Sequence, residues 1–129
     1  MKRRLLLDTC ALVWLATGDS KLSDKARETV ATAASVFVSP VSAWEIGQKH
    51  RRGLLKLPMT PRELFQTAVD RYSLDIAPLD PEVMFSATAL PEHHKDPADR
   101  FIIATALLGN MTVVTADHRF HAYGVDVLG

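Results

Sequence analysis

The stretch RRLLLDTCALVW, residues 3–14, places a single acid between two apolar runs. The three leucines at 5–7 form a short uninterrupted apolar run, which is typical of a strand covered on both faces. Residues 9–16 then have the pattern of a helix that stops near Gly18. Asp8 therefore lies where a buried strand meets a helix, either as the cap of that helix or as part of a functional site.

Length and composition indicate one globular domain over residues 1–129, long enough to bury a core. Fifteen basic and fifteen acidic residues cancel, so contact with a nucleic acid would require a local basic patch. Cys10 is the only cysteine, which excludes an internal disulfide and favours a reducing compartment. No apolar stretch reaches the roughly 20 residues of a membrane span. We expect a cytoplasmic protein that does not use a membrane.

Strand and helix patterns alternate along the chain, and several helices begin with a capping residue followed by proline. Strands are predicted at 35–40, 74–79, 111–117 and 125–128, and helices at 23–34, 41–52, 60–74, 80–90 and 96–109. A short helical turn is expected before the last strand. The alternation favours a three-layer α/β domain with a largely parallel sheet. The helix over 41–52 is expected to bury Val41 and Trp44 and to turn Glu45 towards a cleft.

Acidic residues stand at comparable joints of this pattern. Asp8 ends the first strand and Asp117 closes the strand over 111–117. Asp96 and Asp99 share one face at the start of the helix over 96–109, and Glu45 lies about one turn into the helix over 41–52. In an open parallel sheet, ligands bind beyond the carboxyl ends of the strands. The acids are therefore expected along one edge of the sheet.

Each acid also has an ordinary structural explanation. Asp8 and Asp96 suit helix caps, Glu45 and Lys49 have the spacing of a surface ion pair, and Asp117 suits a turn. Capping does not, however, require the acids to gather at one edge. Carboxylates that converge repel one another and need a cation, and oxygen ligands favour Mg²⁺ or Mn²⁺. Such a site typically works on phosphates, which makes phosphoryl chemistry the expected activity.

Two neighbouring histidines, His93 and His94, lie close to the acids in the sequence. Adjacent residues point their rings in different directions. We therefore expect both to be loop residues or residues on the substrate side of the site, and not metal ligands.

Four segments together resemble the successive motifs of PIN-domain ribonucleases, and most of all the VapC-type toxins of bacterial toxin–antitoxin pairs. They are LLLDTCALVWL at 5–15, VSPVSAWEIGQKHRRGLLKL at 38–57, HKDPADRFIIATAL at 94–107 and TVVTADHRFHAYGV at 112–125. The resemblance extends over residues 5–127 and is weakest between 54 and 90. It implies a PIN-like domain with a five-stranded, mainly parallel sheet and a metal-dependent endoribonuclease site.

The resemblance also implies the roles of individual residues. The site acids correspond to Asp8, Glu45, Asp99 and Asp117, which would hold one or two Mg²⁺ or Mn²⁺ ions, with Glu45 acting partly through water. The expected products carry 5′-phosphate and 3′-hydroxyl ends. Relatives often have histidine at the position of Cys10, but this is not a ligand position, so the expected activity is unchanged.

Supporting roles are expected for Asp96 and for the threonines Thr9 and Thr115, which stand beside two of the acids. The threonines can donate hydrogen bonds to a carboxylate or to phosphate, although helix starts and strands also favour threonine. Asp96 ranks below Asp99 as a site acid.

Basic residues concentrated in QKHRRGLLK, residues 48–56, are candidates for contacts to the RNA backbone. We expect this role for Lys49, Arg51 and Arg52, and also for Arg100 beside Asp99. A basic helix end also complements the helix dipole, and Arg100 is equally suited to pairing with an acid.

Other functional classes fit the sequence less well. A receiver-like phosphoacceptor domain needs an acid pair after the first strand, and a haloacid-dehalogenase-like phosphatase needs a second acid where Cys10 stands. A PIN-fold binding module without nuclease activity remains an alternative. The resemblance implies a homodimer that is silenced by a small cognate antitoxin protein.

Overall fold

The structure is a computed structural model that describes residues 3–94 and 96–129. Its sheet has five strands in the order β3-β2-β1-β4-β5, and every neighbouring pair is parallel. The strands are β1 (Arg4–Leu7), β2 (Ser35–Val38), β3 (Asp75–Ile76), β4 (Thr112–Val114) and β5 (Val127–Leu128). The predicted α/β fold with a five-stranded, mainly parallel sheet is confirmed. The strands at 74–79 and 111–117 are shorter than predicted.

Six α-helices and one 3₁₀ helix connect the strands. They are α1 (Thr9–Thr17), α2 (Asp24–Thr32), α3 (Pro40–Arg51), α4 (Pro61–Tyr72), α5 (Pro81–Ala89), α6 (Pro97–Gly109) and η1 (His118–Tyr123). Each begins after a Ser, Thr or Asp whose side chain accepts a hydrogen bond from a backbone N–H of the first turn. Four of them carry proline at the first turn, including Pro40, which starts α3 directly after Ser39.

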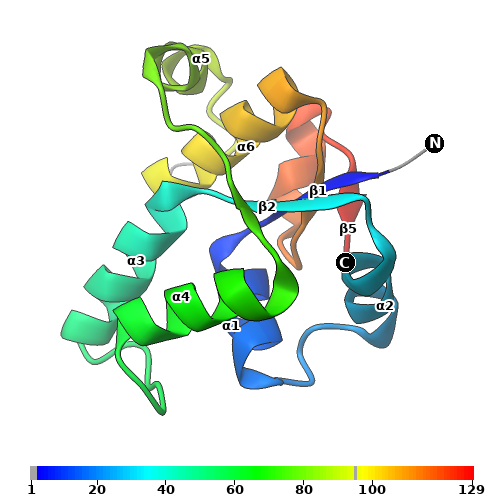
Figure 1. Ribbon diagram of the computed structural model, residues 1–129. Coiled ribbons are helices and arrows are strands. Elements are labelled where there is room, and N and C mark those ends of the chain that lie inside the picture. The colour runs from blue at the N-terminus through cyan, green and yellow to red at the C-terminus, as the bar shows by residue number, and fades with distance from the viewer. Residues whose placement is uncertain (1–2, 95) are drawn as a thin grey trace.

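The sheet lies between two helical layers (Figure 1). Leu5 and Leu7 of β1 point to the face covered by α1, α2 and α4, and Leu6 points to the face covered by α6 and η1. All three leucines are fully buried, as the uninterrupted apolar run predicts for a central strand of a parallel sheet. Each face therefore has its own apolar core, and β1 contributes to both.

Helix α3 differs from the sequence prediction in the face that it buries. Val41, Ser42, Glu45 and Ile46 are buried, and Trp44 is 60% exposed. The prediction that Trp44 is a core residue is wrong. Positions 41, 42, 45 and 46 form one stripe of the helix, and successive residues are about 100° apart, so Trp44 lies outside this stripe. The buried stripe holds a carboxylate because α3 faces the site as well as the core.

Within the described residues, the helices are all too short or too polar to cross a membrane.

Candidate active site

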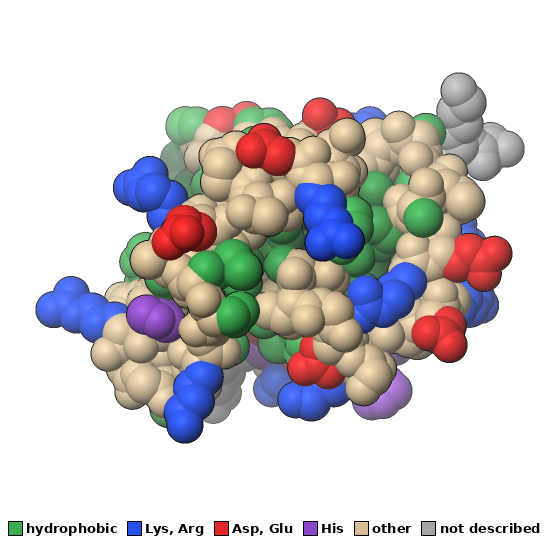
Figure 2. All heavy atoms as spheres, turned by 60° about the horizontal axis from the view of Figure 1, so that its bottom comes forward, with side chains coloured by type: hydrophobic (Ala, Val, Ile, Leu, Met, Phe, Trp, Pro, Cys, Tyr) green, Lys and Arg blue, Asp and Glu red, His purple; other side chains and the backbone are tan. Residues whose placement is uncertain are grey.

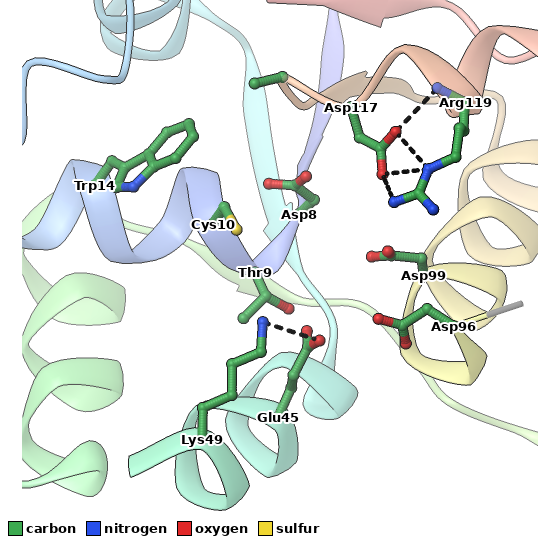
Figure 3. Close-up of a pocket in the computed structure, with 11 residues that line it drawn as sticks. Asp8, Thr9, Cys10, Trp14, Glu45, Lys49, Asp96, Asp99, Asp117 and Arg119 are labelled. Carbon is green, nitrogen blue, oxygen red and sulfur yellow. Dashed lines mark hydrogen bonds and ion pairs between the residues drawn. The ribbon is translucent and has the colours of Figure 1, made fainter. Parts of the chain in front are cut away.

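The five acids that the sequence places at the joints line one cleft of about 350 Å³ at the carboxyl edge of the sheet (Figure 3). They are Asp8, Glu45, Asp96, Asp99 and Asp117. Asp8 follows β1, Asp117 follows β4, Glu45 comes from α3, and the other two come from the start of α6. The central position of β1 beside β4 brings together acids from opposite ends of the chain.

Asp8 is both a helix cap and a buried acid of the cleft. Its Oδ1 accepts a hydrogen bond of 2.8 Å from the N–H of Ala11, and its own N–H donates to the carbonyl of Val114 on β4. Burial raises the pKa of Asp8 to about 6, and the charges of Glu45 and Asp117 add to this shift. Asp8 therefore caps α1 and at the same time lies in the cleft.

Glu45 is 7% exposed and lies on the buried stripe of α3. Its Oε2 is 3.4 Å from Nζ of Lys49, the ion pair that the sequence spacing suggested. Its Oε1 is buried and has no hydrogen-bond partner among the described residues. A buried carboxylate oxygen without a partner is costly, and a cation in the cleft would satisfy it.

Asp96 and Asp99 lie one turn apart at the start of α6. Asp96 is the cap, because its Oδ1 accepts a hydrogen bond of 2.9 Å from the N–H of Ala98. Asp99 points into the cleft, where burial and then the charges of Asp96, Glu45, Asp8 and Asp117 raise its pKa to about 7. Asp99 therefore lies where negative charge is least tolerated without a cation.

The surroundings of Asp117 lower its pKa, whereas those of Asp8 and Asp99 raise theirs. The guanidinium group of Arg119 donates to both of its carboxylate oxygens at 2.8–3.2 Å, and the N–H of Arg119 donates to Oδ1 at 2.9 Å. These bonds hold the pKa of Asp117 at about 2, so it stays charged at neutral pH. The cleft thus combines one acid that is always ionised with two whose charge is disfavoured.

The supporting threonines hold the acids in place from behind. The hydroxyls of Thr9 and Ser42 are 3.0 Å apart and connect α1 to α3, next to Asp8 and Glu45. The N–H of Asp117 donates to Oγ1 of Thr115 at 3.0 Å. Both threonines are buried and make contacts within the protein.

His94 is a component of the site that the sequence interpretation missed. Its ring is 3% exposed, and its Nε2 lies 2.8 Å from Oδ2 of Asp99 and 3.1 Å from Oδ2 of Asp117. His94 lies in the loop between α5 and α6, as expected, but the sequence interpretation did not place its ring against two of the acids. The only sequence signal is its place two residues before the Asp96-Pro97 cap.

Arg100 does not reach the cleft. Its guanidinium group donates to four backbone carbonyls, those of Ala87, Leu90, Pro91 and His94, at 2.8–3.2 Å. These contacts do not support the predicted role of Arg100 in binding RNA, and Arg100 forms no ion pair with an acid among the described residues. Its donors are used to hold the connection between α5 and α6.

The remaining basic candidates differ in position. Lys49 lines the cleft, whereas Arg51 and Arg52 are exposed at the end of α3 and are absent from its lining. Figure 2 shows charged side chains of both signs spread over the face that carries α4 and the ends of α1 and α3, with no single basic patch. On this face, therefore, charge alone marks no surface for a polyanion.

The donor set suits a hard cation. Carboxylates from Asp8, Glu45, Asp99 and Asp117 face a common space, and all their ligand atoms are oxygens. This chemistry matches Mg²⁺ or Mn²⁺ better than zinc, which favours cysteine and histidine ligands. Burial and mutual repulsion, visible in the raised pKa values of Asp8 and Asp99, are the conditions under which a cation binds most favourably.

Comparisons with known proteins agree with this geometry. Ribonuclease VapC22 of Mycobacterium tuberculosis is 27% identical over 120 residues, which are 92% of this chain and 91% of that protein. The crystal structure of VapBC2 from Rickettsia felis, bound to a DNA fragment from its promoter, superimposes with a TM-score of 0.74 at 16% identity and 97% coverage of both chains. VapC20 of Mycobacterium tuberculosis, described as a toxin that cleaves the sarcin–ricin loop, gives a TM-score of 0.60 at 17% identity, covering 94% of this chain and 95% of its own.

A family profile agrees with the fold and the acid cluster over nearly the whole length. The PIN domain profile matches residues 5–126, from β1 to the segment before β5. This chain belongs to the PIN domain family.

Proposed function

We propose that this single domain, residues 1–129, is a metal-dependent endoribonuclease that hydrolyses RNA phosphodiester bonds and serves as the toxin of a toxin–antitoxin pair. The observation that carries the proposal is the convergence of Asp8, Glu45, Asp99 and Asp117 from four separate segments on one cleft. The relationship to Ribonuclease VapC22 supports RNA as the substrate. Mg²⁺ or Mn²⁺ is the metal that the all-oxygen donor set favours.

Each acid has a part in holding the cation. Asp8, Asp99 and Asp117 offer carboxylate oxygens, and Glu45 offers the buried Oε1 that has no partner among the described residues. When bound, the metal would supply an activated water and stabilise the charge of the displaced phosphate oxygen. Lys49, paired with Glu45 at the rim, keeps one carboxylate oxygen turned towards the cleft. Its ammonium group is also placed to meet a backbone phosphate.

Arg51 and Arg52 extend this basic rim along the exposed end of α3. We assign them to the RNA backbone, because both side chains are exposed and neither forms an ion pair among the described residues. Contacts of this kind bind without reading sequence and weaken as salt concentration rises.

The test is cleavage of a labelled RNA by the purified protein with Mg²⁺ or Mn²⁺, with and without a chelator. Asp8→Asn and Asp117→Asn should lose most of the rate, because a neutral amide holds a cation poorly. Asp126→Asn is the matched control, since Asp126 is exposed and outside the cleft. Cleavage that persists in both site variants or in chelator would contradict the proposal. RNA binding without cleavage would instead indicate a binding module.

For partners, we propose a small antitoxin protein and a homodimer. An acidic cleft attracts an inserted basic side chain, and one solved structure of similar fold is a toxin–antitoxin complex from Klebsiella pneumoniae. Large apolar side chains left exposed, among them Leu54, Phe85 and Leu108, provide surface for further contacts. We place the activity in the cytoplasm, where an antitoxin produced from the adjacent reading frame is available.

Two measurements separate these partner proposals. Light scattering of the isolated protein should give a dimer, and a monomer at micromolar concentration would contradict that part. Co-expression should yield a complex with the adjacent product that no longer cleaves RNA. A neighbouring product that neither binds nor inhibits would remove the toxin–antitoxin proposal and leave the nuclease proposal standing.

A further inference from the structure

His94 joins two acids that come from different segments of the chain. Asp99 is on α6 and Asp117 follows β4, and one ring nitrogen of His94 contacts both, at 2.8 Å and 3.1 Å between Nε2 and the respective Oδ2 atoms. The ring is 3% exposed, so water does not compete for these contacts. A group in this position fixes the distance between two carboxylates of the cleft.

The second ring nitrogen settles the hydrogen-bonding role of the first. Nδ1 of His94 accepts a hydrogen bond of 3.2 Å from the backbone N–H of Asp96. A nitrogen that accepts a hydrogen bond carries a lone pair and no proton. The proton of the ring therefore sits on Nε2, which donates to Oδ2 of Asp117, and Oδ2 of Asp99 lies 2.8 Å from the same nitrogen.

This arrangement argues against a metal–ligand role. The ring nitrogen and the two carboxylate oxygens lie within 4.8 Å of one another, a spacing that three ligands of one ion can have. A histidine ligand, however, binds through the lone pair of the nitrogen that faces the ion and donates its other N–H to an acceptor. In His94, Nδ1 accepts a hydrogen bond from the N–H of Asp96. Nε2, the nitrogen that faces the acids, therefore carries the proton and has no lone pair to offer a metal ion.

Two further contacts hold the His94 ring and its backbone. Arg100 donates to the carbonyl oxygen of His94 at 3.2 Å, and the ring of Phe120 packs edge-on with its centroid 5.9 Å away. His94 is thus held through its carbonyl oxygen, its ring and its Nδ1 atom. Only Nε2–H is directed at the acids.

We propose that His94 is a positioning residue, which is hydrogen-bonded through Nε2–H to Asp117, contacts Asp99 through the same nitrogen, and so holds both carboxylates ready for a cation that the other acids share. The proposal rests on the metal site of the proposed function. His94 would orient the carboxylates that bind the cation, and every atom bound to the cation would be an oxygen.

The test compares His94→Gln and His94→Leu in the binding of Mn²⁺ alone, measured by electron paramagnetic resonance and calorimetry. The glutamine amide places an N–H donor close to the position of Nε2, whereas leucine fills a similar volume without a donor. Loss of such a supporting hydrogen bond typically lowers metal affinity by about 10–100-fold. We expect that loss for His94→Leu, near-normal binding for His94→Gln, and an unchanged ratio of Mn²⁺ affinity to Zn²⁺ affinity in every form. His93→Leu is the neighbouring control, because His93 is exposed and packs on Tyr123.

The alternatives give different results. If His94 were a ligand, both variants would lose affinity and Zn²⁺ binding would fall more than Mn²⁺ binding. Wild-type affinity in His94→Leu would also overturn the proposal. Nitrogen NMR of the metal-free protein should show the proton on Nε2 of His94, and a proton on Nδ1 would refute it. Failure of the wild-type protein to bind Mn²⁺ would count against the metal site itself, and the NMR result would still decide the role of the ring.

Discussion

Removing the guanidinium group of Arg100 should destabilise the protein without a direct effect on RNA binding. Its two terminal nitrogens donate to the carbonyls of Ala87, Leu90, Pro91 and His94. In Arg100→Met these four acceptors lose their partner together. In Arg100→Lys the positive charge remains. A compact ammonium group, however, cannot donate to all four of the carbonyls that the planar guanidinium group of Arg100 reaches.

The size of the effect follows from the hydrogen bonds that are lost. Each contributes about 0.5–1.5 kcal/mol net, and part of this is recovered where water reaches a freed carbonyl. We expect Arg100→Met to lower the free energy of unfolding by about 2–4 kcal/mol, and Arg100→Lys to lower it by more than half as much. For a domain of this length the former corresponds to a fall in melting temperature of roughly 8–16 °C.

Thermal melts and fluorescence anisotropy with a labelled, uncleavable RNA are the assays. Arg51→Met is the contrast, since Arg51 is exposed at the end of α3 and its loss should weaken RNA binding with little change in stability. The reasoning is refuted if Arg100→Lys has wild-type stability and Arg100→Met loses RNA affinity at an unchanged melting temperature. That outcome would restore Arg100 as a phosphate contact.

Further expectations concern the acids and Trp44. The pKa values of Asp8 and Asp99 are raised from 3.8 to about 6 and about 7, so the folded state binds more protons than the unfolded state between these values. Melting curves of the metal-free protein should therefore show stability falling as pH rises from about 4 to 7, and Mn²⁺ should restore it above that range. Asp8→Asn removes a buried charge and can still cap α1, so it should raise the melting temperature of the metal-free protein in slightly alkaline buffer; a fall would contradict this. Glu45→Gln should abolish cleavage in the RNA assay at unchanged stability. Trp44→Ala should cost at most about 1 kcal/mol in chemical denaturation, because the side chain is 60% exposed, and a larger loss would mean that it is buried.

The sequence predicts the fold well because its local signals agree with one another. The run at 5–7 is uninterrupted because β1 is central, and caps such as Thr60 and Asp80 mark helix starts to within a residue. The acid cluster is predicted for a related reason. Residues that follow parallel strands meet at one edge of the sheet, whatever their separation along the chain.

The errors arise where a long-range contact outweighs a local pattern. The apolar side chain of Trp44 predicts a core position. The buried stripe of α3 instead holds Glu45 and Ser42, and Trp44 is exposed. Arg100 is next to an acid in sequence, but its acceptors are carbonyls around the end of α5 and in the following loop. His94 lies in the loop before α6 and its ring contacts Asp99 and Asp117, and no periodic pattern encodes such contacts.

The central position of β1 in the sheet has a consequence for how the protein folds during its synthesis. The first strand to be synthesised pairs with β4, which is almost the last, and Asp8 and Asp117 meet only through that pairing. Contacts between such distant segments form late in folding, because a long loop must close before they are made. A nascent chain on the ribosome therefore carries no complete cleft. The acid cluster is complete only once β4 has paired with β1.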